Sequence, residues 1–200
     1  PGSAPEGHST PSTGSGATTR CVGGPVMMRC SAARAQTCCE ATRAKTLSAV
    51  TTTRAGDDRL SGGPGNDVLS GGPGEDILRG AGGDDRLIGG AHADGLFGGS
   101  GADILLGRGG RDGLFGGADP DVLHGGGDAD WLDGGGGRDR LFGEPGDDQL
   151  TGGGGSDVLH GNAGADVMRG GPGPTDACHG DGSTDTLAAE YGCETVTAVP

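Results

Sequence analysis

The sequence predicts an all-β fold: a right-handed parallel β-roll, or β-solenoid, of about six to seven coils. Three observations predict it. An aspartate recurs every nine residues from Asp58 to Asp166, an apolar residue follows each aspartate two positions later, and a glycine follows four positions later. The repeated unit is G-G-x-G-x-D-x-L-x, with glycine at positions 1, 2 and 4, aspartate at position 6 and the apolar residue at position 8.

Each unit divides into a turn and a strand. Positions 1 to 6 are rich in glycine, which reaches positive φ without strain from a Cβ atom, so these residues are expected to form a turn. Positions 7 to 9 are expected to form a short strand whose middle residue faces inward, because side chains alternate across a strand. Two units would make one coil, with odd and even units in two facing sheets. Coils that stack at about 4.8 Å would give a rod about 30 Å long.

The predicted core is thin. One leucine-sized side chain is buried for every nine residues, and aromatic residues make up 2% of the chain. Such burial contributes roughly 1.5–3 kcal/mol for the one leucine of each unit, whereas ordering costs roughly 1–2 kcal/mol for every one of its nine residues, so the apolar gain does not match the ordering cost. Residues 53–187 also carry 24 acidic and 9 basic side chains, and stacking would align the aspartates in two columns of like charge. The roll therefore needs a further stabilising partner, and the acidic columns point to a cation.

The repeat resembles the nonapeptide of the RTX, or haemolysin-type calcium-binding, proteins from about Thr53 to Leu187. In that family the module accompanies toxins, proteases, lipases, epimerases and adhesins, so the resemblance indicates a fold and an ion rather than a biological role. It implies Ca²⁺ ions held between loops two units apart, by position-6 carboxylates and by backbone carbonyls of the glycine positions. Calcium accepts six to eight oxygens in flexible geometry, whereas Mg²⁺ requires a tight octahedron. One ion per stacked pair of loops gives about ten ions.

The ligands that the resemblance implies follow the repeat. The side-chain ligands would be Asp58, Asp67, Asp76, Asp85, Asp94, Asp103, Asp112, Asp121, Asp130, Asp139, Asp148, Asp157, Asp166, Asp176 and Asp185. The backbone ligands would be the carbonyls of Gly63, Gly65, Gly72, Gly74, Gly99, Gly101, Gly135, Gly137, Gly153 and Gly155. The strict period ends at Asp166, since the next aspartate of the series follows ten residues later.

Three units replace the glycine at position 4, with His92, Asp119 and Asp128. Aspartate tolerates a left-handed backbone, so two of these units are compatible with an ordinary turn. His92 is the most suspect, because a bulky residue is uncommon at such a position. The alternative interpretation is an altered ion site.

The outward strand positions carry a strip of apolar side chains. Phe97 and Phe115 lie two units apart and are expected to stack, with Trp131 on the same sheet. An exposed apolar strip can mark a partner surface, although outward aliphatic residues are also simple strand formers. His124 and His160 share a phase but lie two coils apart, which is too far to share one metal. The other members of the strip are Val68, Ile77, Ile104, Leu106, Phe142, Val122, Val158 and Val167.

The two ends differ from the repeats. Residues 1–48 are expected to form a disordered, low-complexity leader or linker, with residues 49–187 as the roll and residues 188–200 as its cap. The leader allows a short, weak helix between Ala32 and Lys45. It also contains four cysteines whose spacing matches no zinc pattern and whose state stays open: Cys21, Cys30, Cys38 and Cys39.

The C-terminal segment resembles the cap of secreted, actinobacterial-type members of the family. In that cap Cys178 and Cys193 would form a disulfide. It would close a loop of about 15 residues, worth roughly 3 kcal/mol in the chain-entropy description. Two free thiols are the alternative.

These features favour a secreted calcium-binding module with a structural or adhesive role. The alternatives are the non-catalytic C-terminal region of a larger secreted protease, lipase or epimerase, and a module that binds glycan or cell-surface polysaccharide. Extracellular calcium modules bind at roughly 10⁻⁴ to 10⁻³ M, which with the cysteines favours an oxidising, extracellular location. The chain contains no H-E-x-x-H, G-x-S-x-G or Walker A sequence, so no enzyme is predicted. Its acidic balance argues against nucleic acid, and no apolar run is long enough to span a membrane.

Overall fold

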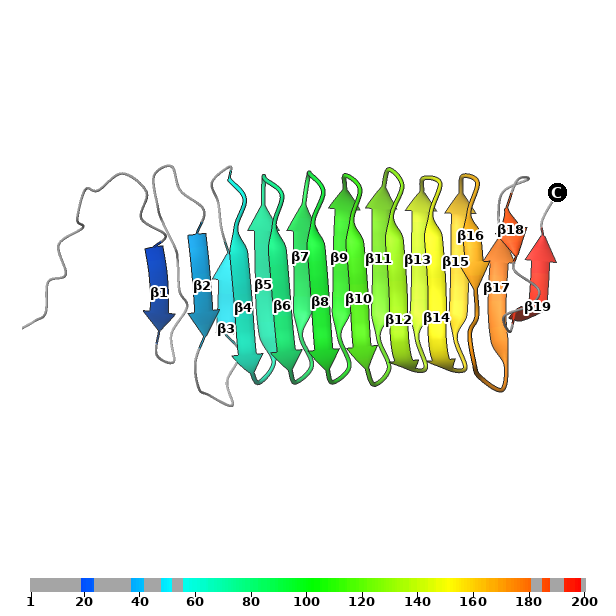
Figure 1. Ribbon diagram of the computed structural model, residues 1–200, viewed down its shortest axis with the longest axis horizontal. Helices are drawn as coiled ribbons and strands as arrows, with labels where there is room; N and C mark the ends of the chain where they lie inside the picture. The colour runs from blue at the N-terminus through cyan, green and yellow to red at the C-terminus, as the bar shows by residue number, and fades with distance from the viewer. Residues whose placement is uncertain are drawn as a thin grey trace, which may run out of the picture.

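The computed structural model shows a parallel β-solenoid of about seven turns. Its strands run across the long axis of the molecule and are stacked side by side along it, and the chain passes back and forth between two sheets (Figure 1). The described part of the chain contains strands and turns and no helix. The structure describes residues 19–23, 37–41, 48–51, 56–180, 185–187 and 193–198.

From the second strand of the chain onward, strands alternate between the two sheets, and every neighbouring pair within a sheet is parallel. The prediction that odd and even units occupy two facing sheets is therefore confirmed. In order across the first sheet lie β1 (Thr19–Gly23), β2 (Thr37–Ala41), β4 (Arg59–Pro64), β6 (Ile77–Gly82), β8 (Gly95–Ser100), β10 (Gly113–Ala118), β12 (Trp131–Gly137), β14 (Gln149–Gly155), β16 (Val167–Arg169) and β18 (Thr186–Leu187). Across the second lie β3 (Ser48–Thr51), β5 (Asp67–Gly72), β7 (Arg86–Gly90), β9 (Ile104–Gly109), β11 (Val122–Gly127), β13 (Arg140–Pro145), β15 (Val158–Ala163), β17 (Asp176–Gly180) and β19 (Cys193–Ala198).

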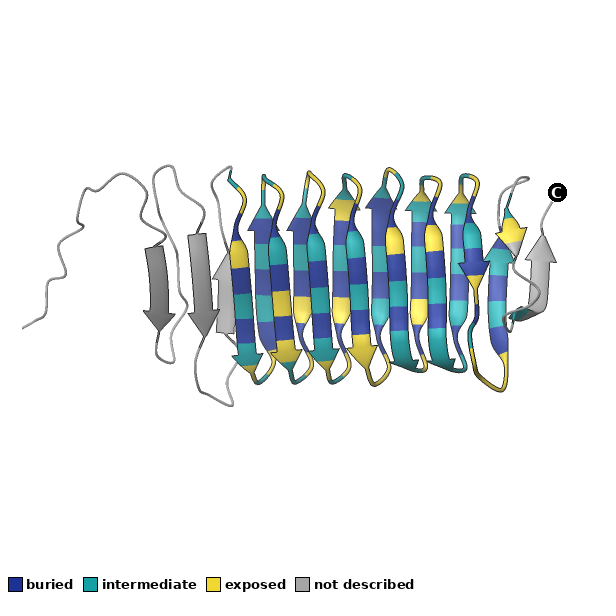
Figure 2. Cartoon of the chain, in the orientation of Figure 1, coloured by how far each residue is buried: buried dark blue, intermediate teal, exposed yellow. Residues whose placement is uncertain are grey.

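The core is the space between the two sheets. In the central coils each strand pairs with the strand two units away along the chain, so that Leu96 aligns with both Leu78 and Leu114. The position-8 residues are at most 2% exposed, and buried bands alternate with more exposed ones along each strand (Figure 2). The inward side chains are Leu60, Leu69, Leu78, Leu87, Leu96, Leu105, Leu114, Leu123, Leu132, Leu141, Leu150, Leu159 and Met168, and Cys178 continues the series.

The N-terminal segment contains strands where a disordered leader was expected. Strands β1 and β2 extend the first sheet beyond β4, and β3 extends the second sheet beyond β5. The expectation of a helix between Ala32 and Lys45 is wrong, since Thr37–Ala41 is a strand. Threonine and cysteine favour strands over helices, and the open edge of β4 offers a template for pairing. The boundary at residue 49 stays a prediction, and Cys30 lies outside the described residues.

The C-terminal end is closed by two further strands. Strand β18 pairs with β16, and β19 pairs with β17. The extra residue before Asp176 is absorbed in a turn, because the strands on either side keep their pairing. A disulfide joins Cys178 to Cys193, with 5.6 Å between the two Cα atoms. It links β17 covalently to the strand that covers its edge.

Candidate calcium sites in the turns

The backbone of the turns follows the glycine positions of the repeat. The ten glycines predicted to supply carbonyl ligands all have φ between 95° and 152°. This is the left-handed region, which residues with a Cβ atom rarely adopt. The shape of the turn therefore favours glycine at these positions, independently of any ion.

The first glycine of each unit is needed for a different reason. A Cβ atom on Gly98 would overlap Oδ2 of Asp103 and would lie 2.6 Å from the carbonyl oxygen of Gly116 in the next coil. The same relation recurs at Gly134, Asp139 and the next coil's carbonyl. The carboxylate and a carbonyl thus converge on one small space that only a glycine leaves open.

The position-6 aspartates form two columns along the turns. Within a column, the backbone N–H of each aspartate donates to Oδ1 of the aspartate in the next coil: Asp85 to Asp103 at 2.7 Å, and Asp103 to Asp121 at 2.8 Å. The structure thus brings together aspartates two units apart, as expected. Column A consists of Asp58, Asp76, Asp94, Asp112, Asp130, Asp148 and Asp166, continued by Asp185. Column B consists of Asp67, Asp85, Asp103, Asp121, Asp139, Asp157 and Asp176.

In twelve of these aspartates the second carboxylate oxygen is buried and accepts no hydrogen bond from any described residue. An orphaned anionic oxygen is expensive inside a protein, because nothing replaces the water that it has lost. An oxygen that recurs in coil after coil without a hydrogen-bond partner suits the binding of a cation and is not an accident of packing. The oxygens are Oδ2 of Asp76, Asp85, Asp94, Asp103, Asp112, Asp121, Asp130, Asp139, Asp148, Asp157, Asp166 and Asp176.

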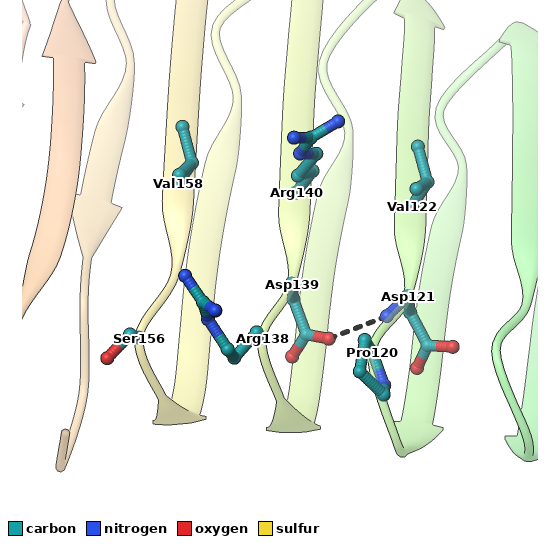
Figure 3. A pocket seen from close by; sticks show the side chains of 8 residues that line it. All are labelled: Pro120, Asp121, Val122, Arg138, Asp139, Arg140, Ser156 and Val158. Atoms are coloured by element: carbon teal, nitrogen blue, oxygen red, sulfur yellow. Dashed lines mark hydrogen bonds between the residues drawn. The ribbon is translucent and has the colours of Figure 1, made fainter.

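A stretch of column B shows the arrangement at close range (Figure 3). One oxygen of Asp139 accepts the N–H of Asp121 at 2.8 Å, and the other oxygen points away from that bond. Beside them is a cavity of about 420 Å³ that Pro120, Arg138 and Ser156 help to line. The space next to the column is open from the surface.

A second cavity lies beside column A. It measures about 260 Å³, and Asp57, Asp58, Glu75 and Asp76 are among the residues that line it. A cavity thus lies beside each of the two columns.

Burial raises the pKa of the column carboxyls from Asp76 to Asp166. Loss of hydration is the largest cause; the charges of neighbouring aspartates raise these pKa values further, while the backbone hydrogen bond lowers them. The pKa of Asp112 rises to about 8, and that of Asp94 to about 7. Also raised are those of Asp85, Asp121 and Asp148 to about 7, and of Asp103, Asp130 and Asp139 to about 6. A fully ionised pair of columns is thus unfavourable without a counter-ion.

The donors available in the turns fit calcium. Among the described residues, no group of three or more His, Cys, Asp and Glu side chains is placed to hold one metal ion. A coordination shell here must therefore combine a few carboxylate oxygens with backbone carbonyls, which suits a hard cation with many oxygen ligands. Zinc prefers histidine and cysteine ligands in a closed tetrahedron, and the turns do not provide that set.

Further aspartate side chains accept hydrogen bonds from backbone N–H groups of neighbouring turns. At position 5, Asp84 Oδ1 accepts the N–H of Ala102 at 3.0 Å, and Asp147 Oδ1 accepts the N–H of Ala165 at 2.9 Å. At position 4, Asp119 Oδ2 accepts the N–H of Gly101 in the preceding coil at 3.1 Å. Sequence reasoning missed the position-5 role, although the two-unit spacing between these side chains and the turns they support was a signal for it.

The units that depart from glycine behave in two ways. Asp119 and Asp128 have φ of 76° and 77°, so aspartate does adopt the left-handed turn at position 4, as expected. His92 does not have positive φ. Sequence reasoning overlooked position 2, where four non-glycine residues have φ between 64° and 88°: Ala81, Arg108, Glu144 and Asn162.

The outward faces carry two columns of stacked rings. On the first sheet Phe97 and Phe115 stack with centroids 5.0 Å apart and planes 5° apart, and Trp131 follows at 6.2 Å and 50°. Arg79 places its guanidinium 5.2 Å from the centre of the Phe97 ring. The stacking expected from the sequence is confirmed.

The second sheet carries a column that the sequence did not reveal. Phe142 lies between His124 and His160 and stacks on both, at 4.7 Å and 5.2 Å. His179 continues the column at 4.5 Å from His160. His124 Nδ1 also lies 2.9 Å from Glu144 Oε1. The two histidines of equal phase are separated by a phenylalanine, in keeping with their expected distance of two coils.

Comparison with known families agrees with this geometry. The family model described as "RTX calcium-binding nonapeptide repeat (4 copies)" matches residues 52–87, 71–105, 79–114, 106–141, 115–150 and 142–174. No curated protein matches the chain. In the part of the chain that the structure describes, no helix has the length and apolar character needed to cross a membrane. The family matches together extend over residues 52–174, more than half of the chain, and the chain therefore belongs to the family of RTX calcium-binding nonapeptide repeat proteins.

Proposed function

We propose that this chain is a secreted calcium-binding module that folds around about ten Ca²⁺ ions and serves a structural or adhesive role. The observation that carries the proposal is the pair of aspartate columns, in which twelve carboxylates each have one buried oxygen that accepts no hydrogen bond from the described residues. Family membership supports calcium as the ion.

The two oxygens of each column carboxylate have separate tasks. Oδ1 of Asp103 holds the N–H of Asp85 and so fixes the spacing between coils. Oδ2, beside Gly98 and the carbonyl of Gly116, would contribute to an ion site between the loops. The carbonyls at positions 2 and 4 would complete the shell. Calcium bound there would supply positive charge that offsets both the desolvation of the carboxylates and their mutual repulsion.

An extracellular location is part of the proposal. Extracellular calcium modules have affinities of roughly 10⁻⁴ to 10⁻³ M, so such sites would fill outside a cell and stay empty in the cytosol. The disulfide between Cys178 and Cys193 supports the same location, because disulfides persist in oxidising compartments.

A structural task inside a longer secreted protein is compatible with the same sites. The chain would then be the non-catalytic region of a protease, lipase or epimerase. Reading the gene upstream of Pro1 separates the two forms of the proposal, because a catalytic motif there would assign the chain to a larger enzyme.

The test is a calcium titration followed by far-ultraviolet circular dichroism, with Mg²⁺ as control. We expect a cooperative gain of β-structure at sub-millimolar to millimolar Ca²⁺, reversed by a chelator and absent with Mg²⁺ at the same concentration. A spectrum that does not respond to Ca²⁺ would refute calcium-dependent folding. Calorimetry on the same sample would give the number of ions.

The exposed ring column favours a second candidate function, the binding of cell-surface polysaccharide. Trp131 is 55% exposed and ends the Phe97–Phe115 stack on the first sheet. The two phenylalanines face each other, so Trp131 provides the accessible ring face on which a sugar could stack. A variant with Phe97, Phe115 and Trp131 replaced by Ser, still folded in Ca²⁺, should lose binding to polysaccharide in a sedimentation assay. Unchanged binding would reject this function.

A further inference from the structure

Column A changes its backbone geometry at one loop. Position 2 has a left-handed φ in every described unit from residue 63 to residue 171 except at Gly90. Position 4 of the same unit is His92, which does not have positive φ either. Loop 89–94 is thus the one described loop in which neither position adopts the left-handed conformation. Every other described loop keeps a left-handed φ at position 2, although Gly146 and Gly173 lack it at position 4, so the backbone of loop 89–94 departs furthest from the common turn.

The charge of column A changes at the same place. The space between two stacked loops of one column is called a junction here. At the junction of loops 89–94 and 107–112, the two column aspartates are matched by Arg108 and Arg111, so the formal charge is zero with His92 neutral. At the junction of loops 143–148 and 161–166, two column aspartates are joined by Glu144 and Asp147, and the formal charge is −4. Calcium affinity depends on the ligand charge and the rigidity of a site.

We propose that the junction of loops 89–94 and 107–112 is the weakest calcium site of column A and divides that column into two arrays that load separately. The inference rests on the proposed function, because it concerns the distribution of calcium among sites of the same kind. The N-terminal array extends from Asp58 to Asp94, and the C-terminal array extends from Asp112 to Asp166. The expected affinity at the dividing junction is about tenfold lower than at the C-terminal array, since both charge and loop geometry are unfavourable there.

Column B has no equivalent break. Its basic loop residue is Arg138, but Gly135 and Gly137 in that loop keep φ of 95° and 152°. The negative charge of loop 134–139 is therefore reduced by Arg138, while its backbone keeps the left-handed conformation of the other turns. The two columns therefore allow the effect of charge to be separated from the effect of loop geometry.

Two backbone N–H groups allow the dividing junction to be compared with a junction inside the C-terminal array. Asp94 N–H donates to Asp112 Oδ1 at 2.8 Å across the dividing junction, and Asp130 N–H donates to Asp148 Oδ1 at 2.8 Å within the C-terminal array. The bonds have equal length and equal chemistry. A difference in their protection at partial calcium loading would therefore reflect the junctions and not the bonds.

The experiment is hydrogen–deuterium exchange of the full chain, read by NMR at the Ca²⁺ midpoint and at saturation. At the midpoint, the amide of Asp94 should exchange about tenfold faster than that of Asp130, and the two should converge at saturation. A repaired variant, His92→Gly with Arg108→Gly and Arg111→Asn, should remove the difference. It should also bind one more Ca²⁺ in calorimetry when the two proteins are compared just above the midpoint.

Arg138→Asn is the matched control, because it removes one positive charge from a loop of regular backbone in column B. It should leave the ratio of the two amide rates unchanged. Equal protection of Asp94 and Asp130 in the unmodified chain at the midpoint would overturn the inference, and so would a repaired variant with an unchanged ratio. A chain with no response to Ca²⁺ at any amide would instead overturn the proposed function.

Discussion

The leucine interior and the aspartate turns share the same two-unit register but differ in what completes them. Leu105 is fully buried between the aligned Leu87 and Leu123, and its environment needs nothing from solvent. Asp103, two residues earlier, is almost as buried, yet one of its oxygens lacks a hydrogen-bond partner among the described residues. Burial of the leucines thus favours folding, while the buried carboxylates of the turns make the stability of the folded state depend on the cations and the pH of the solution. Stacking identical units is favourable for apolar side chains and unfavourable for like charges.

The largest effect is expected when a carboxylate, the side chain found in the turns, is placed in the leucine interior. Leu105→Asp puts an unpaired carboxylate between the sheets, where neither a cation nor a backbone N–H is available, and burial of an isolated charge costs more than a domain can supply. The variant should stay unfolded even in saturating Ca²⁺, as seen by circular dichroism. Leu106→Asp in the same strand faces outward and should fold normally. A folded Leu105→Asp protein would contradict the inward register.

The next largest effect is expected when the pH is changed in the absence of calcium, because the turn carboxylates titrate and the leucine interior does not. The raised pKa values of Asp112, about 8, and of Asp94, about 7, mean that the metal-free roll binds protons that the unfolded chain has released. The stability of the metal-free roll should therefore increase as the pH falls from 9 to about 5, by about 1.4 kcal/mol for each pKa unit and carboxyl. Below the ordinary carboxyl pKa of 3.8 both states are protonated and the gain should stop.

Circular dichroism in a chelator at pH 9, 7 and 5 measures this effect. With Ca²⁺ present the trend reverses, because protons compete for the same oxygens, so the calcium midpoint should move to higher concentration as the pH falls. A metal-free spectrum that is independent of pH would show that the column carboxyls are not coupled to folding.

A single column carboxylate should have a smaller, local effect. Asp103→Ala removes an oxygen from two junctions and leaves the N–H of Asp85 without its acceptor, at a cost of about 1–3 kcal/mol. Calorimetry should show the loss of at least one Ca²⁺ and a higher midpoint. Asp133→Ala removes the same charge from the outward face of β12 and should leave the number of ions unchanged. Equal stoichiometry in the two variants would refute the ligand assignment.

The smallest effect on the number of bound ions is expected at the capped end, where a covalent bond joins the last strands. Replacing both Cys178 and Cys193 by Ala removes a link that closes a loop of 15 residues, at a cost of roughly 3 kcal/mol. The calcium midpoint should rise without a change in the number of ions. A loss of several ions would mean that the disulfide organises the columns and not only the end of the roll.

Much of this architecture follows from the period alone. The repeat and the alternation of strand side chains predict two sheets, inward leucines and aspartates that meet at every second unit, because these relations depend on phase and not on detail. The stacking of Phe97 on Phe115 follows in the same way. Phase does not distinguish the two oxygens of one carboxylate. The backbone bond to Oδ1 of Asp103 and the isolation of Oδ2 therefore required coordinates.

Other features could not be predicted from the sequence, because they depend on local departures from the nine-residue repeat. His179 joins the ring column with His160 only because one extra residue before Asp176 shifts its phase. Arg108 and Glu144 adopt a left-handed backbone that glycine usually provides, since the neighbouring coils hold the turn in place. The strand at Thr37–Ala41 forms because the edge of β4 is available for pairing, and the segment shows no periodicity of its own.

The longer turn before Asp176 has a consequence for the size of the molecule. The bond from Asp157 N–H to Asp176 Oδ1 spans one residue more than its neighbour in the column and keeps the same length, 2.9 Å. Each coil therefore recognises only the coil next to it, as in other solenoids. Deleting two consecutive units would remove one strand from each sheet and leave both columns aligned, whereas deleting a single unit would exchange the two columns beyond the cut. The roll accordingly has no intrinsic length, and whole coils can be gained or lost while every remaining side chain keeps its kind of neighbour.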